Sequence, residues 1–269
     1  MSLAVATPGV GPLLRDWRQR RRLSQLALAL EAEVSPRHLS FVETGRSKPS
    51  RELLLHLAEH LDVPARERND LLLAAGYAPA YHETPLDDEA MAPVRLALDR
   101  ILAGHRPFPA VIVDRRWDLV AANDEAFTLF ADGVAGELLE PPVNAMRLSL
   151  HPDGLAPRVT NLGEYSAHLL ERLDRQAARS FDPAVSELCA ELRTYPGVRE
   201  PSAQAADTAS MLYIPLRLRT GDGSADVLSF FSTVATFGTA VDITLDELAI
   251  ESFFPADALT EAALRALVA

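Results

Sequence analysis

The 269-residue sequence is poor in cysteine and lysine and has no long apolar run. Its single cysteine, Cys189, excludes an internal disulfide and fits a reducing cytosol. No stretch of about 18 residues is apolar throughout, and the N-terminus lacks a basic segment followed by an apolar core. A membrane span and a signal peptide are therefore not expected, and we predict a cytoplasmic protein with no membrane partner.

Sequence motifs for catalysis and metal binding are missing as well. The chain has no nucleophile elbow, no phosphate-binding Walker loop and no dinucleotide fingerprint. His151, His168 and Cys189 are widely separated and lack the short spacing of metal ligands. We predict that the protein is not an enzyme and needs no metal, although His151 or His168 could bind haem.

Length and charge divide the chain into two parts. At 269 residues it is several times longer than one domain of five short helices, so a second domain is required. Residues 1–80 hold 11 basic and 9 acidic side chains, whereas the remainder holds 15 basic and 29 acidic ones. The net charge of −12 therefore divides into +2 and −14. Binding to a polyanion requires only local positive charge, which the first part has.

The N-terminal part is predicted to form a bundle of five short helices. Ser24, Ser35 and Ser50 each precede an apolar segment, and their hydroxyls can cap the second, third and fourth helices. Pro36 stands at the first position of the third helix, where the missing amide costs nothing. Gly45 can end that helix in a left-handed conformation. This capped helix pair is typical of a helix-turn-helix domain, whose second helix enters the major groove.

This part resembles the DNA-binding domain of the lambda-repressor-like (Xre) transcriptional regulators. The stretches that carry the resemblance are Leu23-Ser24-Gln25, the helix 35–43 and Glu43-Thr44-Gly45-Arg46-Ser47-Lys48-Pro49. The resemblance implies that Gln25 contacts a phosphate and supports the recognition helix, and that Pro36, Arg37 and Phe41 face base edges. Because Pro36 has no side-chain donor, base reading is expected to depend on Arg37, which can bind guanine O6 and N7. The residues predicted to contact DNA are Gln25, Ser35, Pro36, Arg37, His38, Ser40, Phe41, Arg46, Lys48 and Arg51.

Two basic segments flank the helix pair. They contain Arg15, Arg18, Arg20, Arg21 and Arg22, and then Arg46, Lys48 and Arg51. A basic run is most often only a solvated helix face. Because these runs adjoin a helix-turn-helix pattern, we expect them to contact phosphates.

Residues 77–89 contain two prolines and an acidic run without periodicity, which is typical of a linker. We predict a helix-turn-helix domain at 1–80, a linker at 81–89 and a second domain at 90–269. A helix from Asp88 to Ala103 is expected to open the second domain. Its inward face is predicted to carry Met91, Val94, Leu98, Ile101 and Leu102.

The rest of the second domain mixes strand and helix patterns. Strands are expected at 110–113, 117–121, 211–219, 227–237 and 243–254, the first four as two hairpins, the second of them turning at Gly221-Asp222-Gly223. Capped helices are expected at 123–130, 161–178, 182–194 and 257–268. The predicted fold class is therefore multidomain, with the all-α bundle followed by an α+β domain whose helices lie across one face of an antiparallel sheet. The element order is that of a PAS-type sensor.

This second half resembles the MmyB-like ligand-binding domain, a PAS-related module found behind this kind of helix-turn-helix. The matching stretches are residues 110–123, Asn144-Ala145-Met146-Arg147-Leu148 and Phe181-Asp182-Pro183. The resemblance implies a bacterial transcription factor with an apolar cavity for a fatty-acid-like chain. No cofactor is expected beyond such a ligand.

The candidate ligand site is defined by apolar residues and one arginine. The predicted ligand-binding residues are Phe127, Phe130, Met146, Arg147, Tyr165, His168, Leu169, Tyr213 and Phe231. At helix and strand spacing such apolar residues are more often plain core. Arg147, with His151 and His168 as substitutes, could pair with a carboxylate, because a guanidinium can form two parallel hydrogen bonds with it. An arginine at such a position is more often only a surface or structural residue. The alternative is a C-terminal domain that only dimerises or docks a protein partner.

The predicted partners are a double-stranded DNA operator, a small apolar ligand and a second copy of the chain. One recognition helix covers a few base pairs, while two helices about 34 Å apart read a palindromic operator. We therefore expect a homodimer.

Overall fold

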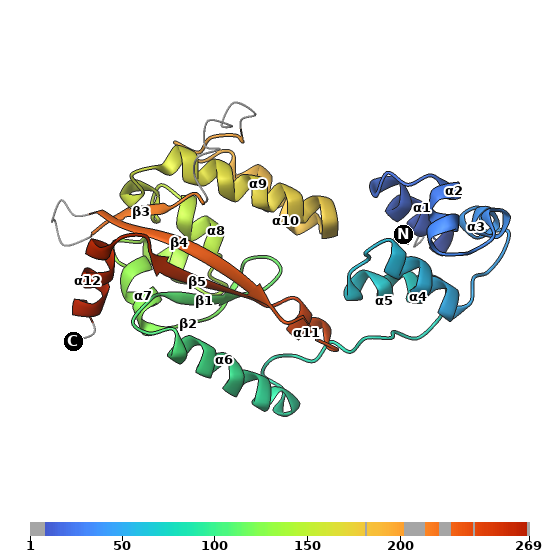
Figure 1. Ribbon diagram of the computed structural model, residues 1–269, viewed down its shortest axis with the longest axis horizontal. Helices are drawn as coiled ribbons and strands as arrows, with labels where there is room; N and C mark the ends of the chain where they lie inside the picture. Colours follow the sequence, from blue (N-terminus) through green and yellow to red (C-terminus); the bar gives the residue numbers. More distant parts are fainter. Residues whose placement is uncertain (1–8, 181, 202–212, 221–226, 239, 268–269) are drawn as a thin grey trace, which may run out of the picture. The chain divides into compact units, whose positions relative to one another are not determined.

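The computed structural model describes residues 9–180, 182–201, 213–220, 227–238 and 240–267 (Figure 1). The chain divides into two compact units, Met1–Glu83 with Ala240–Ile243 and Thr84–Thr239 with Thr244–Ala269. Within the described ranges, no helix is both long enough and apolar enough to cross a membrane.

The first unit is a bundle of five short helices. They are α1 (Val10–Arg20), α2 (Gln25–Glu31), α3 (Pro36–Glu43), α4 (Arg51–His60) and α5 (Ala65–Ala74). The hydroxyls of Ser24 and Ser50 cap α2 and α4 by accepting bonds of 3.0 and 3.2 Å from amides three residues further on. Gly45 and Gly76 follow helix ends with φ of 72° and 77°, as glycines after helices do. The leucines buried fully between the helices include Leu14, Leu28, Leu39, Leu54, Leu57, Leu61, Leu71 and Leu72.

The second unit is built on a five-stranded antiparallel sheet of order β2-β1-β5-β4-β3. Its strands are β1 (Ala110–Val113), β2 (Leu119–Ala122), β3 (Leu216–Arg219), β4 (Val227–Thr236) and β5 (Ala249–Pro255). Both predicted hairpins are present, since β1 pairs with β2 and β3 with β4. The last strand, β5, pairs with β1 on one side and β4 on the other, so it joins the two hairpins into one sheet.

Helices cover both faces of this sheet (Figure 1). Strand alternation turns Val111 and Val113 of β1 toward the main core, and Ala110 and Ile112 toward the opposite face. The main core is packed by α7 (Asp124–Phe130), α8 (Ala145–Leu150), α9 (Leu162–Ser180), α10 (Pro183–Leu192) and α12 (Ala258–Leu267). The opposite face is covered by α6 (Ala92–Gly104) through two buried leucines. The prediction of helices across one face only is therefore wrong.

Several predicted boundaries are corrected as well. Ile243–Asp246 form the short helix α11, so β5 begins at Ala249 rather than at Ile243. Trp117 lies in the turn before β2, with a left-handed φ of 67°. Ile101, predicted to face inward, is 37% exposed. Single-turn 3-10 helices lie at Glu89–Met91, Gly136–Leu139 and Ala156–Arg158. Residues 211–212 and 221–223, assigned to the second hairpin, lie outside the described residues.

Candidate functional site

Helix α3, the predicted recognition helix, turns the predicted base-reading residues outward. Its exposed or half-buried residues, with the cap, are Ser35, Pro36, Arg37, His38, Ser40 and Phe41. Leu39 and Val42 face the bundle and are each 1% exposed. The guanidinium carbons of Arg37 and Arg46 lie 5.4 and 5.9 Å from the Phe41 ring centroid. This aromatic ring thus holds two cations at the outer surface of the helix.

A buried ion pair fixes α3 against α1. Arg18 Nε and Nη2 donate to the two carboxylate oxygens of Glu43 at 2.7 and 2.8 Å. Gln25 Nε2 donates to the same carboxylate at 2.7 Å, so the residue predicted to support the recognition helix does reach it. Burial opposes ionisation of Glu43, but the bonds from Arg18 and Gln25 outweigh it, and the pKa of Glu43 is lowered.

Two arginines of the first basic segment have structural partners. Arg18 is 8% exposed and is held by Glu43, so its expected phosphate contact is not supported. Arg21 donates to the carbonyl oxygens of Leu61 and Asp62 at 2.7 and 2.8 Å, where α4 ends. Sequence reasoning missed these roles because the partners lie far away along the chain.

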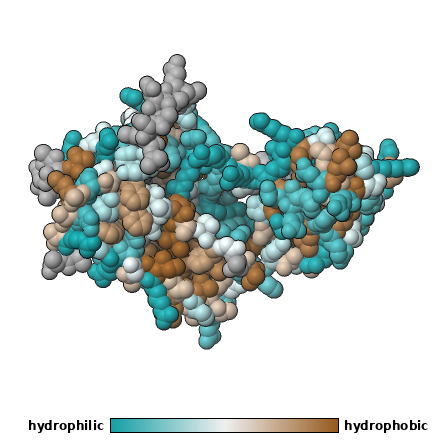
Figure 2. All heavy atoms as spheres, in the orientation of Figure 1, coloured by the Kyte–Doolittle hydropathy of each residue, from teal (hydrophilic) through white to brown (hydrophobic). Residues whose placement is uncertain are grey.

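The second basic segment is available to solvent. Arg46, Lys48 and Arg51 are all exposed. Lys48 Nζ lies 4.9 Å from the Tyr77 ring centroid, and the Tyr77 hydroxyl donates to the Pro49 carbonyl at 2.9 Å. Arg51 stands in the first turn of α4, whose amide groups also favour a phosphate. Figure 2 shows that the visible face of this unit is mainly hydrophilic.

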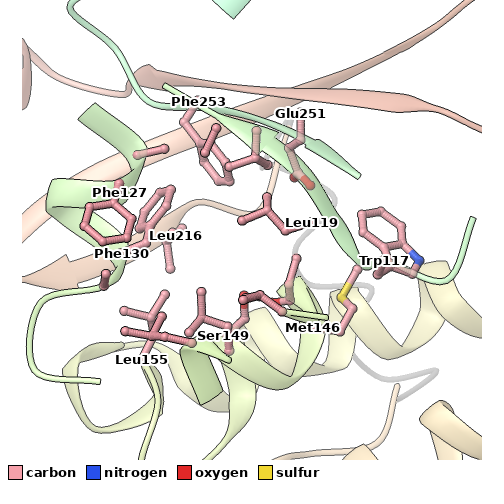
Figure 3. A pocket seen from close by; sticks show the side chains of 18 of the residues that line it. Trp117, Leu119, Phe127, Phe130, Met146, Ser149, Leu155, Leu216, Glu251 and Phe253 are labelled. Carbon is pink, nitrogen blue, oxygen red and sulfur yellow. The ribbon is translucent and has the colours of Figure 1, made fainter. Parts of the chain in front are cut away.

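An apolar cavity of about 120 Å³ lies within the second unit (Figure 3). Its hydrophobic lining comes from both sheet and helices, and includes Val111, Trp117, Leu119, Phe130, Met146, Leu155, Leu169, Leu216 and Phe253. The polar side chains in the lining are Ser149, Tyr165 and Glu251. The Glu251 carboxylate points into the same space as Leu119 (Figure 3). The cavity can therefore hold an apolar group beside a small number of polar contacts.

A second cavity of about 230 Å³ lies next to the first. Five residues form walls of both cavities, namely Tyr165, Leu169, Leu216, Glu251 and Phe253. Its lining adds His168, Arg172 and Ser232, so it is more polar than the first. We call the two spaces the apolar cavity and the polar cavity.

The predicted ligand-binding residues are divided between these cavities. Phe127, Phe130, Met146, Tyr165 and Leu169 line the apolar cavity, although Phe127 is also 66% exposed. His168 and Tyr213 line the polar cavity, together with Tyr165 and Leu169. Two residues are absent from both linings. Arg147 Nε and Nη2 donate to the Glu191 carboxylate at 2.8 and 2.7 Å, and Phe231 stacks on Phe254 with ring centroids 5.2 Å apart.

Two residues with acidic or basic side chains in the cavity walls, Glu251 and Arg172, were not predicted from the sequence. Glu251 Oε1 accepts a hydrogen bond from Ser232 Oγ at 2.7 Å and lies 3.4 Å from Arg172 Nη1. The signal available in the sequence was an acidic residue, Glu251, within the mainly apolar strand β5. Because alternate strand residues share a face, Glu251 lies on the same face as Phe253.

The surroundings keep two wall residues uncharged. Burial and the nearby Glu251 raise the pKa of Tyr165, so its phenol stays protonated. Burial and the positive charge of Arg172 lower the pKa of His168, so its imidazole is neutral at pH 7. The acidic and basic side chains that face these two residues across the cavity walls are Glu251 and Arg172.

Comparisons with known proteins follow the same division of the chain. A family model for a helix-turn-helix domain matches residues 10–71. The model of the MmyB-like transcription regulator ligand binding domain matches residues 94–267. No curated protein matches the chain. A solved structure of an RNA-binding light-oxygen-voltage receptor matches at 13% identity and a TM-score of 0.29, over 97% of this chain and 62% of its own length.

A helix-turn-helix pair whose second helix is exposed and a separate domain with an apolar cavity are the parts that a ligand-responsive regulator requires. Both matched families are domains of such regulators and not of enzymes. The match to the ligand-binding domain extends over more than half of the sequence. The chain therefore belongs to the family of MmyB-like transcription regulators, with a helix-turn-helix DNA-binding domain at its N-terminal side.

Proposed function

We propose that the protein is a cytoplasmic, homodimeric transcription regulator whose operator affinity is set by a fatty-acid-like ligand. The observation that carries the proposal is the apolar cavity in the ligand-binding domain. Moving an acyl chain from water into such a space contributes about 0.8 kcal/mol for each CH₂ group. An apolar lining therefore favours a chain-like ligand over a polar metabolite.

The size of the apolar cavity limits what it holds without rearrangement. At about 120 Å³ it is smaller than an engineered cavity of about 150 Å³ that admits benzene. A medium-length acyl chain must therefore extend beyond it. The polar cavity, which shares five wall residues, is the adjacent space available to it.

Dimerisation is supported by apolar side chains on the outer surface of α6. Leu96 and Ile101 are 51% and 37% exposed although they belong to a well-formed helix. Figure 2 shows apolar areas on the visible face of the second unit. A second copy that covered such side chains would bury apolar surface and bring two recognition helices to one operator.

The testing experiment is extraction and mass analysis of small molecules that co-purify with the full-length protein, quantified per chain. A stoichiometric acyl compound supports the proposal. Val143 lines the apolar cavity, so the larger side chain of Val143→Phe should partly fill that cavity and lower the amount of acyl compound bound per chain. Val120→Phe adds the same volume at a residue that is 36% exposed and outside both linings, so it should leave occupancy unchanged. A protein that footprints its promoter with nothing bound would favour partner docking instead.

A further inference from the structure

We propose that the apolar and polar cavities are the tail and head-group parts of one site, in which Arg172 binds the carboxylate of the acyl ligand. This inference rests on the proposed function, because it assigns the head group of that ligand. The two cavities share part of their walls. They are adjacent, because five residues border both of them: Tyr165, Leu169, Leu216, Glu251 and Phe253.

Arg172 is held in place without being saturated. Its guanidinium carbon lies 4.2 Å from the Trp117 ring centroid, and Trp117 Nε1 donates to Gln176 at 2.8 Å. The stacking fixes the plane of the guanidinium. Its hydrogen bond within the described part of the chain is one long contact of 3.4 Å from Nη1 to Glu251. Donors therefore remain for a carboxylate, which a guanidinium binds through two parallel hydrogen bonds.

Arg147, the arginine predicted from the sequence as the carboxylate anchor, differs from Arg172 in that its donors are already bonded. Arg147 already makes two bonds of 2.8 and 2.7 Å to the Glu191 carboxylate, and it lines neither cavity. A ligand carboxylate would have to displace Glu191 to bind there. Arg172 offers an anion site without that cost.

Glu251 opposes the ligand carboxylate and so tunes the site. Its Oε1 atom keeps the 2.7 Å bond from Ser232 when Arg172 turns to a ligand. Two carboxylates would then share one guanidinium, and like charges repel at this distance. Removing the charge of Glu251 should therefore tighten the binding of an acid, while removing the charge of Arg172 should weaken it.

The test compares dodecanoate with 1-dodecanol, binding to the delipidated full-length protein by calorimetry. These ligands share the tail and differ in the head group. Arg172→Gln should weaken dodecanoate binding roughly 10- to 100-fold, as expected for hydrogen bonds to a charged group, and change dodecanol binding by no more than about twofold. Glu251→Gln should tighten dodecanoate binding several-fold. Arg147→Gln is the matched control and should leave both affinities unchanged.

Each other outcome overturns the assignment. An equal loss for acid and alcohol in Arg172→Gln would show a packing role, and an equal effect of Arg147→Gln would place the carboxylate elsewhere. If Arg172→Gln does not fold, Glu251→Gln decides, since an unchanged or weaker dodecanoate affinity contradicts the proposal. Wild-type protein that binds the alcohol as well as the acid refutes the head-group site alone. Protein that binds neither ligand refutes the proposed function as well.

Discussion

At the scale of single residues, two cations near the predicted DNA-contacting surface, Arg37 and Lys48, have different expected roles. Arg37 projects from the exposed side of α3, while Lys48 lies in the segment before α4. Arg37→Ala should weaken operator binding by about 1 to 3 kcal/mol and relax one operator position, whereas Lys48→Ala should weaken all sequences alike and reduce the salt slope by about 1. Equilibrium binding to single-base operator variants at several salt concentrations checks this. Identical behaviour of the two variants would contradict the assignment.

The stability of the first unit is expected to be sensitive to substitution of Glu43. Glu43→Gln leaves Arg18 buried without its counter-ion, and breaking a buried pair in this way costs about 3 to 5 kcal/mol of unfolding free energy. Urea unfolding followed by Trp17 fluorescence in a Trp117→Phe background measures it. Glu31→Gln removes the same charge at an exposed site and should change stability by less than about 0.5 kcal/mol.

Glu43 should also make the stability of the first unit depend on pH. The pKa of Glu43 is lowered from its ordinary 4.5, so the folded state binds fewer protons than the unfolded state at mildly acidic pH. The contribution of the Glu43 carboxylate to the free energy of unfolding is therefore complete above about pH 4.5. It is lost as the pH falls through the lowered pKa of Glu43. Between pH 7 and about pH 3, the free energy of unfolding should therefore decrease less in Glu43→Gln than in the wild type, as measured by unfolding curves at each pH. Equal losses would show that this group does not control acid stability.

At the scale of helices, the close approach of α1 to α3 depends on Gly11. A Cβ there would lie 2.5 Å from the Val42 carbonyl oxygen and 2.7 Å from that of Glu43. Gly11→Ala should therefore cost about 1 to 3 kcal/mol, although alanine is the better helix former by about 1 kcal/mol. Operator affinity should fall with it, because the substitution moves the recognition helix. Gly9→Ala, with open space around the added Cβ, is the control, and equal stability of both variants would contradict the close packing.

At the scale of the whole molecule, dimeric binding predicts a strict spacing of half-sites. Two recognition helices in one dimer reach major grooves about one helical turn apart. Inserting about 5 base pairs between half-sites rotates one site to the opposite side of the duplex and should abolish tight binding, while about 10 base pairs should be tolerated better. Quantitative gel shifts with the full-length protein measure this. Equal affinity for both insertions would indicate that single chains bind independently.

Local features of this protein were predictable because they are decided within a few residues. The hydroxyls of Ser24 and Ser50 cap the helices that they precede, and Gly45 takes the left-handed conformation that ends α3. Both hairpins also pair as expected, because each joins neighbouring strands. The sequence by itself thus determined the five-helix bundle, the α+β class and the outward side of the recognition helix.

The partners of charged residues were decided only by the tertiary structure. Arg18 and Arg147 were interpreted as available for phosphate and ligand, yet each is held by a carboxylate that is 25 or 44 residues away along the chain. The pairing of Arg172 with Glu251 spans 79 residues and requires β5 to insert between the two hairpins. The physical reason is that a charge binds whichever opposite charge packing brings near it, and packing depends on how distant helices and strands come together rather than on local sequence.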